Sequence, residues 1–320
     1  MDGGPLTKNI LFVKTSSLGD VIHHMPALTD ARRHLPKAQF SWVVEEDFAP
    51  LVRLHPAVDE VIPVATRRWR HAVFAPTTWG EIRSFMRRIR TGPYTEIIDT
   101  QGLLRTGLMM RGARARRHGY DRDSIREPLA CRYYDVRHAV SRGLHAIARN
   151  RILTGLALGY MSDVTIDYGL PRENFGSAGR YGLLLHSTAR PEKLWPTDSW
   201  IALGNALRAH GLRLVLPWGS PAERQRGELI ACAIPGAEVP DHAPIDAMAK
   251  LVAGASFVIG VDTGLVHLAA AFGVPLVAIF ISSRPGLTGP MGPGPIAIVG
   301  GEGAMPSVAE AVAAFERVVG

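Results

Sequence analysis

The stretch Val13-Lys14-Thr15-Ser16-Ser17-Leu18-Gly19-Asp20 follows the apolar run Asn9–Val13 and precedes a segment with helical periodicity. From Val21 to Leu35, apolar residues recur at three- and four-residue steps, which predicts one buried helical face. Pro26 lies inside this segment and predicts a kink or a restart of the helix. A strand, a short polar loop and a helix in this order are typical of the first unit of a parallel α/β sheet.

Asp20 has two interpretations in this position. It can cap the start of the helix, which is worth about 1 kcal/mol of stability. It can also act as a general base, because a loop after a parallel strand lies in the crevice where α/β proteins bind ligands. Capping alone does not explain why Lys, Thr, two Ser, Gly and Asp gather in one loop, so we favour the base.

Outward from this loop, both halves of the chain alternate short apolar runs with segments of helical length. This alternation predicts an α/β fold made of two Rossmann-like domains that face each other across a cleft. The turn-rich stretch 167–179 separates the halves, so we expect domains at 1–170 and 171–320, with the last helix free to pack back on the first domain. The predicted strands are Asn9–Val13, Phe40–Val44, Glu60–Val64, Glu96–Asp99, Tyr181–His186, Arg213–Leu216, Phe257–Val261 and Leu276–Phe280.

Two loops of the second half carry residues suited to a phosphorylated sugar. His186–Pro196 follows a predicted strand and supplies hydroxyls and Lys193, which suit a diphosphate. Gly260–Leu268 contains Asp262-Thr263-Gly264 at the start of a helix, where backbone N–H groups favour an anion and a carboxylate can accept sugar hydroxyls. Lys193 as a solvated loop residue and His267 as a core histidine remain open alternatives.

Charge is distributed unevenly along the chain. Residues 1–160 hold 25 Lys and Arg against 15 Asp and Glu, whereas residues 161–320 hold 11 against 14. This asymmetry indicates that the first half faces something anionic, which can be nucleic acid, a phospholipid surface or an acidic small substrate. No aromatic-interleaved basic platform accompanies the charge, so we expect no nucleic acid and favour an acidic acceptor.

The arginines of the first half fall into two groups. Arg67, Arg68 and Arg70 follow a predicted strand end and suit carboxylates or phosphates. Arg83, Arg87 and Arg90 share one helical face and are expected to form a solvated surface. Asp121-Arg122-Asp123 matches the DxD pattern of metal-dependent sugar transferases, but a metal site there leaves the second-half loops without a role, so we expect no metal.

Several strings together resemble the lipopolysaccharide heptosyltransferase I family of bacteria, in glycosyltransferase family 9. The similarity runs through nearly the whole chain and is carried by Val13–Asp30, Trp42–Glu46, Arg67–Arg70, Asp99–Gly102, Arg126–Ala130, Leu216–Gly219 and Val261–Leu268. The stretches Ser282–Pro285 and Asp241–Pro244 depart from the family pattern.

The resemblance implies a GT-B fold and an inverting, cofactor-independent enzyme. The donor would be ADP-heptose and the acceptor the Kdo residue of Kdo-lipid A, in synthesis of the lipopolysaccharide inner core. The enzyme would be cytoplasmic and attached peripherally to the anionic inner face of the inner membrane. The acidic acceptor and anionic surface agree with the basic first half.

The resemblance also assigns roles to single positions. Asp20 would be the catalytic base. The donor would be bound by Ser187, Thr188, Lys193, Glu223, Asp262, Thr263, Gly264 and His267. The acceptor would be bound by Ser17, Arg67, Arg68, Arg70, Gln101, Arg126 and His145.

Three alternatives remain open from the sequence. A heptosyltransferase II-like enzyme would take a heptose acceptor instead of Kdo. A nucleotide-sugar epimerase on the same scaffold would convert its donor without any acceptor. A protein that binds nucleotides or nucleic acid through the basic half would show steeply salt-dependent binding.

Overall fold

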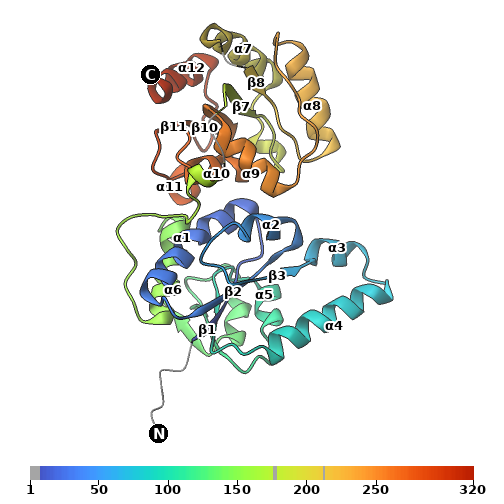
Figure 1. The fold of residues 1–320 in the computed structure, drawn as a ribbon, viewed down its shortest axis with the longest axis vertical. Helices are drawn as coiled ribbons and strands as arrows, with labels where there is room; N and C mark the ends of the chain where they lie inside the picture. Colours follow the sequence, from blue (N-terminus) through green and yellow to red (C-terminus); the bar gives the residue numbers. More distant parts are fainter. Residues whose placement is uncertain (1–7, 176–178, 212) are drawn as a thin grey trace. The chain divides into compact units, whose positions relative to one another are not determined.

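The computed structural model describes residues 8–175, 179–211 and 213–320, which divide into two compact units, 1–169 and 170–320. Each unit contains one sheet, and every strand pair within each sheet is parallel. Helices accompany both sheets (Figure 1). This confirms the predicted α/β class with two Rossmann-like units. No helix of the described part is long and apolar enough to cross a membrane.

The first sheet has the strand order β3-β2-β1-β4-β5-β6. The sequence predicts its first four strands but misses β5 and β6, which are rich in polar residues. The strands are β1 Asn9–Val13, β2 Gln39–Glu45, β3 Glu60–Val64, β4 Glu96–Asp99, β5 Arg116–Tyr120 and β6 Val136–His138. Its helices are α1 Leu18–His34, α2 Ala49–Val52, α3 Thr66–His71, α4 Pro76–Thr91, α5 Leu104–Met109 and α6 Ala146–Leu158, with 3-10 turns at Glu46–Phe48 and Pro128–Tyr133.

Helix α1 runs through Pro26 as one element, so a restart of the helix there is wrong. Met25, Pro26 and Ala27 are all buried, and α1 packs against α6 (Figure 1). Tertiary packing of a buried helix therefore outweighs the hydrogen bond that a proline cannot donate.

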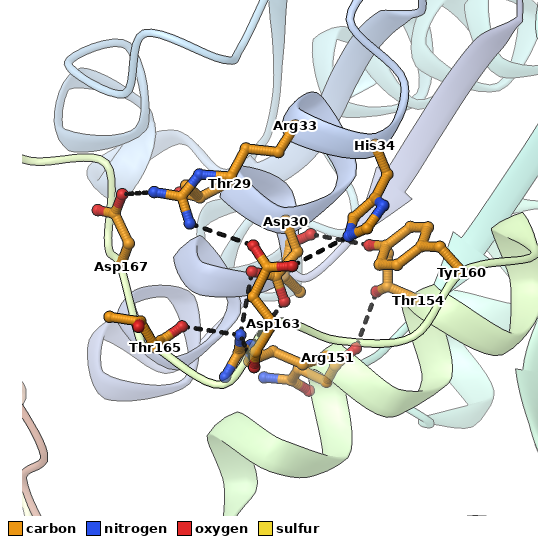
Figure 2. A network of polar contacts seen from close by, with 12 residues as sticks. Thr29, Asp30, Arg33, His34, Arg151, Thr154, Tyr160, Asp163, Thr165 and Asp167 are labelled. Atoms are coloured by element: carbon orange, nitrogen blue, oxygen red, sulfur yellow. Dashed lines mark hydrogen bonds and ion pairs between the residues drawn. The ribbon is translucent and has the colours of Figure 1, made fainter.

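A polar network ties the end of the first unit to α1. Arg151 of α6 donates from Nε to Asp30 Oδ2 at 2.6 Å and from Nη2 to Asp30 Oδ1 at 3.1 Å. The same Nη2 donates to the carbonyl oxygens of Asp163 and Thr165, at 2.6 and 2.9 Å. Figure 2 shows this network with its outer contacts, which join Arg33 to Asp163 and Asp167, and His34 to Asp163. The segment 159–169 that leaves the unit is thereby fixed to its core.

The last turn of this segment lies over the buried imidazole of His55. His55 Nδ1 accepts a hydrogen bond from the N–H of Ala57 at 3.1 Å, and Nε2 lies 3.1 Å from Thr29 Oγ1. Gly169 has φ +65°, and a Cβ at this position would lie 2.5 Å from His55 Nε2. A glycine is therefore required for both the backbone conformation and the space.

We expect the stability of the first unit to fall as the pH drops below about 6.5, because His55 is held neutral. Burial is the main cause, and it lowers the pKa of His55 to about 4. Between these two values the unfolded chain binds a proton that the folded chain rejects, so unfolding becomes easier by up to about 1.4 kcal/mol per pH unit. Urea unfolding between pH 7 and pH 4.5 measures this slope. His55→Asn should flatten it, whereas His71→Asn, at an exposed position, should not; equal slopes in all three proteins would contradict the assignment.

The second sheet has the strand order β11-β10-β9-β7-β8. All four predicted strands of this half exist, and β11 is missed by the sequence. The strands are β7 Tyr181–Leu185, β8 Arg213–Val215, β9 Phe257–Val261, β10 Leu276–Phe280 and β11 Ile296–Gly300. The helices are α7 Thr197–Leu207, α8 Pro221–Cys232, α9 Ile245–Gly254, α10 Gly264–Ala271, α11 Pro285–Thr288 and α12 Val308–Val319, with 3-10 turns at Arg172–Phe175, Pro191–Lys193 and Arg208–His210.

The last helix belongs to the second unit and packs against elements of that unit. Helix α12, at the red end of the ribbon, packs against α7, β10 and β11 (Figure 1). Its Phe315 is fully buried, with its ring 4.7 Å from that of Phe257 on β9. The apolar face of α12 is thus part of the core of the second sheet.

Candidate active site

The strand order of each sheet identifies the place where a ligand binds. In the first sheet the order reverses between β1 and β4, and in the second between β7 and β9. In open parallel sheets the crevice at such a switch point, outside the carboxyl ends of the strands, is the usual ligand site. The loop of Asp20 follows β1, the loop of Gln101 follows β4, and the loops of Ser187 and Asp262 follow β7 and β9. Most of the predicted site loops therefore begin at the two switch points.

The loop after β1 is fixed by the loop after β4. The side-chain oxygen Oε1 of Gln101 accepts hydrogen bonds from the N–H groups of Thr15 and Ser16, at 3.0 and 3.2 Å. Arg105 of α5 donates to Ser16 Oγ at 2.8 Å. Gln101 is buried, so its amide oxygen positions the loop, a role the sequence did not reveal.

Asp20 forms a capping box with Ser17 at the start of α1 and remains partly exposed. Its Oδ2 accepts hydrogen bonds from the N–H and the Oγ of Ser17, at 2.9 and 3.2 Å. Its Oδ1 lies 3.9 Å from Lys14 Nζ, and the side chain is 35% exposed. A carboxylate that is held in place by Ser17 and is partly exposed to solvent can take the proton of a bound hydroxyl.

Lys14 and Asp99 are buried charged residues at the ends of β1 and β4, and neither was predicted as a site residue. Lys14 donates from Nζ to the carbonyl of Thr100 at 3.0 Å. Burial lowers the pKa of Lys14, against the attraction of Asp20 and Asp99, which raises it. Burial likewise raises the pKa of Asp99, although the hydroxyls of Thr106 and Tyr134 donate to it. The sequence contains one signal that could have identified them as site residues: Lys14 directly follows the buried strand β1, and Asp99 is the last residue of β4.

The predicted acceptor arginines lie after β3, which β2 separates from β1. Arg68 forms two hydrogen bonds to Glu46, at 3.0 and 3.1 Å, and an ion pair with Glu81 at 2.9 Å. Arg67 lies 3.5 Å from Asp47, and Arg70 is exposed. Carboxylates therefore already occupy two of the three guanidinium groups, and an acidic ligand must compete with them or displace them.

The other two predicted acceptor residues lie nearer the β5 and β6 side of the sheet. Arg126 is exposed in the loop after β5. His145 is the N-cap residue of α6, where its Nδ1 accepts from the N–H of Ile147 at 3.2 Å. Its ring centroid lies 5.6 Å from that of His23 on α1.

Asp262 is the centre of the site in the second unit. Its Oδ2 accepts hydrogen bonds from Lys193 Nζ and Ser283 Oγ, at 2.5 and 2.6 Å. Its backbone carbonyl accepts from Thr188 Oγ1 at 3.1 Å, and its Oδ1 lies 3.8 Å from His267 Nε2. Four of the predicted donor residues thus come together, and Ser283, from the stretch that departs from the family pattern, joins them.

Asp262 is kept ionised in this cluster. Burial raises its pKa, but the hydrogen bonds from His267, Lys193 and Ser283 and the charge of Lys193 outweigh burial. The pKa of Asp262 therefore lies well below its usual value. A buried carboxylate paired with a lysine can accept hydroxyls on one side while the lysine binds a phosphate on the other.

The remaining predicted donor residues have local structural roles. Thr263 is the N-cap and Gly264 the first residue of α10, whose first-turn N–H groups favour an anion. Ser187 Oγ lies 2.8 Å from Nδ1 of His186. Glu223 Oε2 accepts a hydrogen bond from the N–H of Gly219 at 2.7 Å, at the start of α8. No hydrogen bond or ion pair among the described residues joins Glu223 to Asp262.

Comparisons with known proteins agree on one family. The family model described as "Glycosyltransferase family 9 (heptosyltransferase)" matches residues 82–314. A Pseudomonas aeruginosa relative named lipopolysaccharide heptosyltransferase 1 is 45% identical over 88% of this chain and 81% of its own. The protein of that name from Escherichia coli K12 is 40% identical over 88% and 91%. The solved structure "E. coli heptosyltransferase WaaC with ADP" is 37% identical with a TM-score of 0.90, over 97% of this chain and 99% of that one.

The family match spans more than half of the chain, and the fold agrees with a solved member along nearly its whole length. The resemblance drawn from the sequence is therefore confirmed. The chain belongs to glycosyltransferase family 9, the heptosyltransferases.

Proposed function

We propose that this chain transfers L-glycero-D-manno-heptose from ADP-heptose to the Kdo residue of Kdo-lipid A, in lipopolysaccharide inner-core synthesis. Support comes from relatives named lipopolysaccharide heptosyltransferase 1 at 40–45% identity. A solved structure titled with ADP-2-deoxy-2-fluoro heptose has a TM-score of 0.85, over 97% of this chain. The observation that carries the proposal is the Asp262–Lys193 cluster at the switch point of the second sheet, which places a lysine and a carboxylate where a sugar diphosphate would bind.

The donor lies against the second unit in this proposal. Lys193 and the N–H groups at the start of α10 bind the diphosphate, with Thr188 beside them, and Asp262 and His267 contact the heptose hydroxyls. Lys193 and the helix start stabilise the negative charge that grows on ADP as it leaves. The proposal includes no metal ion or other cofactor, because Lys193 supplies the cation.

The acceptor lies against the first unit. An acceptor hydroxyl attacks the anomeric carbon of heptose, Asp20 takes the hydroxyl proton, and the bond to the diphosphate oxygen breaks with its electrons leaving on ADP. The attack from the opposite side inverts the anomeric centre. Arg67, Arg70 and Arg126 attract the carboxylate and phosphates of Kdo-lipid A, and Ser17 lies beside the base. The acceptor is a membrane lipid, so we place the enzyme on the anionic cytoplasmic face of the inner membrane.

The direct test is ADP release from ADP-heptose, with and without Kdo-bearing lipid A. We expect release that depends on the acceptor and heptose that appears on the lipid. Release with a heptose-bearing acceptor only would favour a heptosyltransferase II-like enzyme. Conversion of the donor without any acceptor would favour an epimerase and overturn the proposal.

Lys193→Ala should weaken ADP binding about 10- to 100-fold, because a charge-assisted hydrogen bond is worth about 1.5–3 kcal/mol. Calorimetric titration with ADP measures this change. Lys250→Ala, at an exposed position of α9, is the matched control and should bind ADP like the unaltered enzyme. Unchanged ADP affinity in Lys193→Ala would remove this residue from the diphosphate site.

A further inference from the structure

The turn between α3 and α4 and the first turn of α4 expose three apolar side chains. Phe74 is 95% exposed, and Val73 and Trp79 are 43% and 52% exposed. The indole Nε1 of Trp79 donates to the carbonyl of Val73 at 2.9 Å, which holds the ring beside the turn. Figure 1 shows this turn at the outer edge of the first unit. Single exposed apolar residues are common, but two in one turn and a third in the adjoining first turn of α4 indicate a contact surface.

Helix α4 continues this surface with positive charge. Its inner face is formed by Thr78, Phe85 and Ile89, which are buried. At 100° per residue, positions 4, 8 and 11 residues after Trp79 fall within about 80° of it on the exposed side. These positions are Arg83, Arg87 and Arg90, all exposed.

The arginines of this face differ from Arg88 in whether a carboxylate neutralises their charge. Arg88, toward the inner side of the helix, pairs with Glu60. Within residues 8–175, 179–211 and 213–320, no carboxylate forms an ion pair with Arg83 or Arg87. Arg90 donates from Nε to the carbonyl of Arg111 at 3.1 Å and keeps its charge. The sequence alone suggests a solvated face here, but solvation does not account for the exposed Phe74 beside it.

We propose that the α3–α4 turn and the basic face of α4 dock the first unit on an anionic phospholipid surface. In this geometry Phe74 and Trp79 enter the headgroup region, while Arg83 and Arg87 contact lipid phosphates. The apolar side chains suit the boundary between headgroups and acyl chains, and the adjacent arginines, which have no carboxylate partner among the described residues, suit the lipid phosphates. A polyanion dissolved in water would leave Phe74 exposed to water. The inference rests on the proposed function because it supplies the means by which the enzyme reaches a lipid-borne acceptor.

Vesicle sedimentation tests the surface. We expect the full chain to bind vesicles of equimolar phosphatidylglycerol and phosphatidylethanolamine, to bind phosphatidylcholine vesicles weakly, and to dissociate from the anionic vesicles as salt rises. Each basic residue near such a surface contributes a factor of about five, so Arg83→Glu with Arg87→Glu should weaken binding about 30-fold or more. Phe74→Ser with Trp79→Ser should weaken it at least tenfold, by about 1.4 kcal/mol or more.

Two control pairs match these changes elsewhere. Arg208→Glu with Arg317→Glu makes the same change in net charge at exposed positions of the second unit. Met161→Ser with Leu229→Ser removes two exposed apolar side chains, at 88% and 62% exposure. Both pairs should retain vesicle binding. Equal binding by the α4 variants and their controls would overturn the proposal.

A spectroscopic measurement covers the case in which a double variant folds poorly. Cys131 is buried and Cys232 exposed, so Phe74→Cys on a Cys232→Ser background provides one accessible thiol for an environment-sensitive fluorophore. A blue shift on anionic vesicles is expected, and a matching Met161→Cys protein should show none. No shift at position 74 would contradict insertion.

Activity separates this inference from the proposed function. With a water-soluble Kdo glycoside, the α4 variants should turn over like the unaltered enzyme, and with vesicle-borne Kdo-lipid A their turnover should fall. Vesicle binding without any Kdo-dependent turnover would refute the proposed function and leave the surface standing. Kdo-dependent turnover with unaltered vesicle binding in the variants would refute the surface alone.

Discussion

Asp20→Asn is expected to lower turnover about 10²- to 10⁴-fold while leaving ADP affinity and thermal stability nearly unchanged. The carboxylate holds Ser17 through Oδ2, and an asparagine oxygen can accept the same hydrogen bonds. The amide cannot take a proton from an acceptor hydroxyl at neutral pH, so only the chemical step should suffer. Single-turnover measurement of heptose transfer, together with ADP titration and a melting curve, separates the two roles of Asp20.

The chain contains a matched control for this substitution. Glu310 closes a capping box at the start of α12 with the same pattern, accepting from the N–H and Oγ of Ser307 at 2.7 and 2.8 Å. Glu310→Gln therefore removes a capping carboxylate with the same hydrogen-bonding pattern and no role in the proposed chemistry. Turnover should be normal in Glu310→Gln. A comparable small effect in Asp20→Asn would leave Asp20 as a helix cap and nothing more.

The strand-end loops were predictable because their chemistry lies in contiguous sequence. Asp20 and Asp262 each follow an apolar run, and a parallel α/β pattern places the ends of such runs at one edge of a sheet. The partners of these residues were not predictable in the same way. Lys193 contacts Asp262 across 69 positions, and only the β7–β9 switch point brings the two loops together. Ser283 was missed for the same reason.

Strand β5 was missed because side-chain contacts with its neighbouring strands stabilise it and its sequence lacks an apolar alternation. Strand β5 reads Arg-Arg-His-Gly-Tyr, and its His118 is buried through contacts with Glu96 at 2.8 Å and His138 at 3.0 Å. These partners lie on β4 and β6, so hydrogen bonds between strands replace the apolar alternation that would reveal a strand. Pro26 led to the opposite error: a restart of the helix was predicted, but α1 continues through Pro26 because tertiary packing outweighs the local effect of proline.

Gln101 and Glu223 show a further limit of site assignment. Gln101 lies in the loop after β4, at the switch point of the first sheet, and Glu223 lies in the first turn of α8, after the edge strand β8; a ligand contact was predicted for both. In the structure the Gln101 amide oxygen accepts from two loop N–H groups, and Glu223 accepts from Gly219. The strand-end pattern cannot distinguish a side chain that contacts the ligand from one that shapes the loop around it, since both must be polar.

Arg151→Met is expected to destabilise the enzyme by about 3–5 kcal/mol, because it leaves a buried carboxylate without its partner. Asp30 is fully buried and is held by two hydrogen bonds from Arg151 (Figure 2). Methionine keeps much of the apolar stem of arginine, so the loss reports the charge and its hydrogen bonds rather than a cavity. The same change frees the carbonyls of Asp163 and Thr165, so the segment before the second unit should exchange amide hydrogen faster.

The pH dependence of this loss identifies its cause. Burial already raises the pKa of Asp30, against the opposing effect of Arg151. Without Arg151 the folded-state pKa rises further, so protonation relieves the unpaired charge and the deficit should be smaller at pH 5 than at pH 8. Urea unfolding at both pH values measures it, and Asp30→Asn added to Arg151→Met should recover part of the stability. Arg33→Met, which breaks exposed ion pairs of the same network, should cost less than about 1 kcal/mol. Two results would mean that Asp30 is neutral in the folded protein. One is a loss of unfolding free energy in Arg151→Met as small as that in Arg33→Met, and the other is a loss that is the same at pH 5 and pH 8.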